Sequence, residues 1–116
     1  MTKPIASSLQ DLINRLFVAT NAFDVDGALA LFTPDCWIDD LSVGGRFEGL
    51  AGVRSYIEQF FVGYETVTQL LSLEMEDNGQ VVACLDLHGY FGHEISAMRI
   101  FVNADGIITA IDANVV

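Results

Sequence analysis

Asp40 is the side chain of this sequence best placed to move a proton. It lies at the end of an apolar segment that we predict to be a strand, Cys36 to Leu41, and period-two alternation puts it on the same face as Ile38. A carboxylate held beside apolar walls is poorly hydrated, which suits a general base or general acid. We therefore expect Asp40 to be catalytic. The alternative is a solvated strand end or a turn cap.

Asp86 and His88 are a second candidate pair, two residues apart on one face of a predicted strand. Inside a cavity, a histidine oriented by a carboxylate could transfer protons near neutral pH. Their direction depends on the loop Gly89 to Gly92, because a change of register by one residue turns a strand over. A loop of even length puts the pair outside, on one face with Arg99 and Asp112. A loop of odd length turns the pair into the cavity. We favour the even loop, because it leaves a cleaner apolar face.

Metal-ligand residue types occur at this same loop. His88 and His93 could lie opposite one another across it, with Glu94 near, and imidazole and carboxylate groups are common ligands of transition metals. Two histidines at a hairpin are more often ordinary polar surface residues. We therefore predict no metal site and no cofactor. Arg99 and Asp112 are expected to form an ion pair on the outer face.

Apolar side chains on the inner face of the predicted sheet and on the helices could line a ligand cavity. An aromatic group near the mouth of such a cavity could orient a ligand, although most of these residues are equally suited to a core. The candidate binding residues are Phe17, Trp37, Tyr56, Phe60, Leu85, Leu87, Met98 and Ile100.

Three helices and a set of strands must position these residues. Apolar residues at helical spacing predict helices over 7–23 and 49–61, and a short helix that Asp24 or Asp26 would cap and Thr33-Pro34 would end. Alternating apolar residues between tight turns predict a meander of four antiparallel strands. Its strands are Thr66–Glu76, Gln80–Gly89, Glu94–Val102 and Ile107–Val115, with turns at Asp77-Asn78-Gly79 and Asn103–Gly106. This arrangement predicts an α+β fold, with three N-terminal helices packed on a curved, mainly antiparallel sheet.

Composition limits the possible partners. The 116 residues suffice for one domain, 1–116, and are 52% hydrophobic with a net charge of −11. That charge disfavours nucleic acid and anionic membrane surfaces. No segment reaches the roughly 20 apolar residues of a membrane span, and the first residues show no secretory signal, so we expect a cytoplasmic protein. Cys36 and Cys84 lie in apolar runs and are expected to be buried, reduced thiols.

The segment from Asn21 to Phe32, N-A-F-D-V-D-G-A-L-A-L-F, together with the strand and acid that follow, resembles the SnoaL-like members of the nuclear transport factor 2-like superfamily. The resemblance implies a cone-shaped fold with a hydrophobic cavity. In the related ketosteroid isomerases, the proton-transferring acid sits at the position of Asp40. Their two oxyanion donors fall at Leu16 and Met98, which cannot donate a hydrogen bond.

Two functions are compatible with this resemblance. The first is an isomerase, cyclase or lyase that acts on a hydrophobic cyclic carbonyl compound, with Asp40 as the proton shuttle. The second is a non-catalytic module that binds such a ligand or associates with a second copy of itself. In either case, the high apolar content predicts a homodimer formed through the outer face of the sheet.

Overall fold

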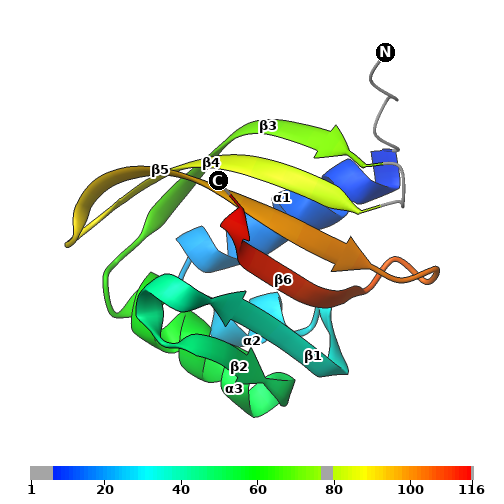
Figure 1. The fold of residues 1–116 in the computed structure, drawn as a ribbon, viewed down its shortest axis with the longest axis horizontal. Coiled ribbons are helices and arrows are strands. Elements are labelled where there is room, and N and C mark those ends of the chain that lie inside the picture. Colours follow the sequence, from blue (N-terminus) through cyan, green and yellow to red (C-terminus); the bar gives the residue numbers. More distant parts are fainter. Residues whose placement is uncertain (1–6, 77–79, 116) are drawn as a thin grey trace.

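A computed structural model describes residues 7–76 and 80–115, which form a strongly curved sheet with helices against its concave side (Figure 1). The helices are α1 Ser7–Asn21, α2 Val25–Leu29 and α3 Gly49–Ile57, the last continued by a π-helical turn, Glu58–Val62. The strands are β1 Phe32–Asp40, β2 Gly45–Glu48, β3 Val67–Met75, β4 Val81–Gly89, β5 Gly92–Val102 and β6 Ile108–Val115. They lie in the order β2-β1-β6-β5-β4-β3.

The expected α+β class is confirmed, but the helices do not all precede the sheet. Helices α1 and α2 come before β1, whereas α3 follows β2. Strand β1 pairs in parallel with β6, so the sheet is mixed, and the expected antiparallel meander β3 to β6 forms four of its six strands. The predicted turn at 77–79 lies outside the described residues.

The first strand begins earlier than the sequence indicated. Asp24 caps α2 by accepting a hydrogen bond from the amide of Gly27 at 3.0 Å, and the helix ends at Leu29 rather than at Pro34. Phe32 then pairs with Ile108 of β6. The pairing of β1 with β6 is irregular between Phe32 and Trp37, a stretch that contains Pro34, which has no amide hydrogen to donate to a neighbouring strand.

The loop between β4 and β5 has the favoured even length. Gly89 pairs with Gly92 across a two-residue turn, and Leu85 pairs with Ser96. Ala83, Leu85 and Ile100 are completely buried on the face that the helices cover. Asp86, His88, Arg99 and Asp112 consequently lie on the outer face, because side chains alternate along each strand.

The pairing of β5 with β6 contains a bulge that the sequence did not indicate. Phe101 pairs with Ala110 but Val102 pairs with Ile108, so β6 carries one extra residue. Strict alternation back from Ile111 would put Ile107 on the inner face, and the bulge changes this. Ile107 is 37% exposed and Ile108 is fully buried instead.

Candidate functional site

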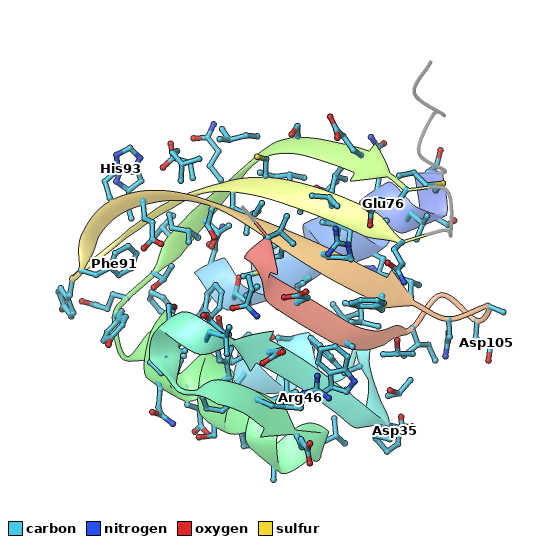
Figure 2. All side chains as sticks on the ribbon, in the orientation of Figure 1. Asp35, Arg46, Glu76, Phe91, His93 and Asp105 are labelled. Carbon is cyan, nitrogen blue, oxygen red and sulfur yellow. The ribbon has the colours of Figure 1, made fainter. Side chains whose placement is uncertain are left out.

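A cavity of about 710 Å³ opens where the end of β1, helix α3 and the β4–β5 hairpin come together. Most of its walls are apolar or aromatic, and Phe91 lies at the tip of the hairpin on the left of Figure 2. The polar side chains on its walls are Asp40, Ser42, Tyr56, Tyr64, Thr66, Glu94, Ser96 and Asn114. An apolar pocket with a few polar groups is the usual form of a small-molecule site.

Asp40 lies at the edge of this cavity, at the end of β1 and directly before a 3₁₀ turn, Leu41–Val43. Its Oδ1 accepts hydrogen bonds from the backbone amide of Ser42 at 3.1 Å and from the Ser42 hydroxyl at 2.6 Å. Its Oδ2 accepts a hydrogen bond from the Tyr56 hydroxyl at 2.7 Å. These donors hold the carboxylate in one orientation. Asp40 therefore both caps the 3₁₀ turn and borders the cavity.

Tyr56 connects Asp40 to the apolar core. Helix α3 holds its ring against Phe47, Phe60 and Phe61, with ring centroids 5.2 to 6.2 Å apart. The residue is only 4% exposed. Burial, the hydrogen bond to Asp40 and the charges of Asp40 and Glu94 all raise the pKa of Tyr56 well above its ordinary value. The phenol is therefore a neutral hydrogen-bond donor across the physiological pH range.

The deep end of the cone is nearly filled. Behind Tyr56 remains a void of about 20 Å³, walled by apolar side chains that include Leu16, Phe17 and Met98. Thr20 is the other polar residue on its wall, and its hydroxyl is bonded to the carbonyl of Phe17 at 3.2 Å. The positions of the missing oxyanion donors thus lie in packed apolar core, and a ligand has room only nearer the mouth.

Seven of the eight candidate binding residues divide into three groups by position. Tyr56, Phe60, Leu87 and Met98 line the large cavity, and Phe17 lines the small void. Leu85 and Ile100 are wholly buried in the core.

Trp37 lies on the opposite face of β1. Its ring is 5.7 Å from that of Phe101, and the Arg46 guanidinium lies 4.0 Å from its centroid. This location follows from alternation, because Trp37 and Asp40 are three residues apart on one strand.

Glu94 and Ser96 are among the polar residues of the cavity that the sequence reasoning missed. Both precede Met98 on β5 at intervals of two, so carrying the inner face back from Met98 would have found them. Ser42 was also missed, although a serine two residues after an aspartate is a common capping pattern.

Arg99 forms the expected outer-face ion pair with Asp112, but at 3.8 Å. Its shorter contact, 2.7 Å, is with Glu76 at the end of β3. The guanidinium therefore has acids on both sides, an arrangement that the sequence reasoning did not foresee. It lies on the outer face, away from the cavity.

A family model described as SnoaL-like domain matches residues 13–111. No match to a curated protein was found. Among the helices of the described residues, none combines the length and apolar character needed to cross a bilayer.

Solved structures with the same fold have low sequence identity to this chain. The epoxide hydrolase/cyclase-like enzyme SalBIII of pyran ring formation in the polyether salinomycin is 19% identical, with a TM-score of 0.80 over 90% of this chain and 87% of that one. A Mycobacterium tuberculosis protein in complex with estradiol-17beta-hemisuccinate is 17% identical, with a TM-score of 0.80 over 96% and 95%. A computationally designed 17-OHP binder is also 17% identical, with a TM-score of 0.79 over 97% and 93%.

Proposed function

This chain belongs to the SnoaL-like domain family, and from that premise we propose that it is a small-molecule enzyme of the isomerase, cyclase or lyase type. Its substrate is a hydrophobic cyclic compound with a carbonyl group, bound in the large cavity. Asp40 transfers a proton between carbon atoms near that carbonyl. One observation carries the proposal: a carboxylate held by three hydrogen bonds borders an apolar cavity of about 710 Å³.

The proposed step is a proton transfer with no change of oxidation state. Asp40 takes a proton from the carbon next to the carbonyl. The electron pair of the broken C–H bond forms a carbon–carbon double bond, and the π pair of the carbonyl moves to its oxygen, which gives an enolate. The same carboxyl group then returns the proton to another atom of the enolate. The hydroxyls of Ser42 and Tyr56 both lie next to this carboxylate, 2.6 Å from Oδ1 and 2.7 Å from Oδ2.

The ligand class is supported by size and by similar folds. A volume of about 710 Å³ lies within the range of ordinary small-molecule pockets. Two of the solved structures named above are described by a ligand, one as a complex with estradiol-17beta-hemisuccinate and the other as a 17-OHP binder. We extend this ligand class to the present chain as part of the proposal.

The test compares two neighbouring acids. Asp40→Asn keeps the shape of the side chain and one acceptor oxygen but removes the carboxylate that acts as the base. Asp39→Asn changes the adjacent acid, whose carboxylate lies 3.7 Å from Arg46 on the outer face. A panel of steroid enones and polycyclic ketones is incubated with each protein in D₂O, and deuterium uptake next to the carbonyl is measured by mass spectrometry.

We expect exchange with the unaltered protein and with Asp39→Asn, and a loss of at least about 100-fold with Asp40→Asn, since a positioned acid or base typically contributes 10²–10⁴-fold. Equal exchange by both variants, with unchanged circular dichroism, would remove Asp40 from the mechanism.

The second candidate is a non-catalytic module that binds the same class of ligand. The filled deep end at Leu16 and Met98 favours it, because no donor there can stabilise an enolate. This candidate predicts saturable binding of a panel compound, equal affinity in Asp40→Asn, and no deuterium uptake with the unaltered protein. The same panel therefore separates the two functions.

We also propose that the protein is a homodimer formed through the outer face of the sheet. Val67 and Ile95 are 51% and 57% exposed, and they pair with His88 and Asp86 on that face. The half-buried rings of Trp37 and Phe101 extend the apolar surface across β1 and β5. A cytoplasmic location stays a prediction from the sequence.

A further inference from the structure

We propose that Asp86, His88 and His93 form a binding site for a divalent transition-metal cation such as Zn²⁺. The three side chains, called here the two-histidine site, lie on the outer face of the sheet near the β4–β5 hairpin, where His93 stands clear of the ribbon in Figure 2. One oxygen or nitrogen atom from each side chain lies within 4.8 Å of the others. Their types are two imidazoles and one carboxylate, a common ligand set for Zn²⁺, Co²⁺ and Fe²⁺.

The pairing of β4 with β5 creates the site. His88 and His93 are direct cross-strand partners, and Asp86 precedes His88 by two residues on the same face. The imidazole rings stack with centroids 4.2 Å apart and planes 6° from parallel. A loop of odd length would have separated the three side chains onto two faces, so the short turn is what brings them together.

The two imidazoles turn the same nitrogen toward the same carboxylate oxygen. Nε2 of His93 lies 2.6 Å from Oδ1 of Asp86, and Nε2 of His88 lies 3.2 Å from that atom. Ligands about 2.0–2.1 Å from a tetrahedral Zn²⁺ are separated from one another by about 3.3 Å. The 3.2 Å spacing of His88 already matches this value, whereas His93 must move away from its 2.6 Å contact and the stacked rings must turn so that both Nε2 atoms point at one ion.

Exposure favours a bound cation with open coordination positions. The side chains of His88 and His93 are 61% and 53% exposed, so they can rotate and an ion can reach them, whereas that of Asp86 is 20% exposed and is held in place. Glu94 pairs with Leu87 and lines the cavity on the other face, so it does not complete the site. Three protein ligands leave at least one position for water or an external ligand.

The chemistry of the site excludes hard cations as its natural occupants. Mg²⁺ and Ca²⁺ prefer oxygen ligands, and this site offers only one carboxylate. A transition metal bound here would join β4 to β5 next to their turn. This proposal is independent of the proposed catalysis, because the two-histidine site shares no residue with the lining of the cavity that Asp40 borders.

The test is a titration of untagged, chelator-treated protein with Zn²⁺, followed by isothermal calorimetry, with Co²⁺ as a spectroscopic probe and Mg²⁺ as the comparison. His88 and His93 are the only two histidines of the sequence, so their ring proton signals can be assigned directly by NMR. We expect one Zn²⁺ per chain, shifts of both sets of ring signals, and Co²⁺ absorption bands of a coordinated ion. We expect no saturable heat with Mg²⁺.

Each ligand variant has a matched control. His88→Gln, His93→Gln and Asp86→Asn should each weaken Zn²⁺ binding by more than tenfold. Glu74→Gln removes an exposed acid from β3 on the same face, and Cys84→Ser removes the nearby thiol; both should leave the affinity unchanged. A Zn²⁺ affinity that survives His88→Gln together with His93→Gln, or that Cys84→Ser abolishes, would overturn the proposal. So would the absence of saturable Zn²⁺ binding to the unaltered protein.

A second readout does not depend on calorimetry. A cation that binds only the folded protein raises its unfolding temperature. Zn²⁺ in excess should raise the midpoint of the unaltered protein and of Glu74→Gln, and should leave the midpoint of the double histidine variant unchanged. An equal rise in all three proteins would place the bound ion elsewhere.

Discussion

The hydrogen bond from Tyr56 to Asp40 joins the core to the cavity. Alternation along one strand was enough to predict the face on which Asp40 lies. The contact with Tyr56 was not predictable in the same way, because the two residues are 16 positions apart in the chain. Only the packing of α3 against β1 brings the phenol within 2.7 Å of the carboxylate. Sequence therefore identified both residues as candidates without identifying them as partners.

The buried phenol makes the free energy of unfolding depend on pH in the alkaline range. Burial raises the pKa of Tyr56 in the folded protein, so above pH ~10 the unfolded chain loses this proton while the folded protein keeps it. The unfolded state then binds fewer protons, and the free energy of unfolding falls as the pH rises further. Tyr56→Phe should reduce this fall, measured by urea unfolding at pH 9, 10 and 11.

At pH 7 the same variant should lower the free energy of unfolding by about 1–3 kcal/mol, because it removes a hydrogen bond to a charged group. Tyr90→Phe is the control for loss of a titrating phenol, since Tyr90 is 76% exposed. If both variants changed the slope of the free energy of unfolding against pH equally, that slope could not be assigned to Tyr56.

At the scale of elements, the β4–β5 hairpin decides which side chains face the cavity. Its two-residue turn directs Leu85 into the core, whereas the preceding Cys84 points to the other side of the strand and is only partly buried. The sequence favoured this register, because alternation then yields one clean apolar face. The bulge opposite Phe101 was not apparent, because Ile107 and Ile108 are identical residues and either could occupy the core position.

The register has a direct mutational test. Leu85→Ala should lower the free energy of unfolding by about 2–5 kcal/mol, because it leaves a cavity in the buried core. Cys84→Ala should cost less than about 1 kcal/mol, because this side chain is only partly buried. The midpoint of urea denaturation at pH 7 measures both effects. Equal losses of unfolding free energy from the two substitutions would contradict the register, which buries Leu85 more deeply than Cys84.

At the scale of the whole molecule, net charge and exposed apolar surface have opposite effects on self-association. A net charge of −11 on each chain opposes self-association, while the exposed side chains of the outer face favour it. Salt screens the repulsion between like charges. Any dimer should therefore be weaker at low ionic strength than at high ionic strength.

The predicted homodimer is tested by light scattering at micromolar concentration in 0.15 M salt. Ile95→Lys should shift the mass toward the monomer, because it places a charge on the proposed interface. Val18→Lys is the matched control, since Val18 is an exposed aliphatic residue of α1, 68% exposed, on the helical side of the molecule. A monomeric mass for the unaltered protein would eliminate the dimer.

The sequence by itself determined the fold class, the family and the faces of most strands. These properties follow from local patterns, namely the alternation of apolar residues, the turn residues and the segment from Asn21 to Phe32. The tertiary structure decided what meets at each site. It brought Tyr56 to Asp40, filled the deep end of the cone around Leu16 and Met98, and gathered Asp86 with two histidines. The physical reason is that such contacts depend on how separate elements pack together, which no local pattern records.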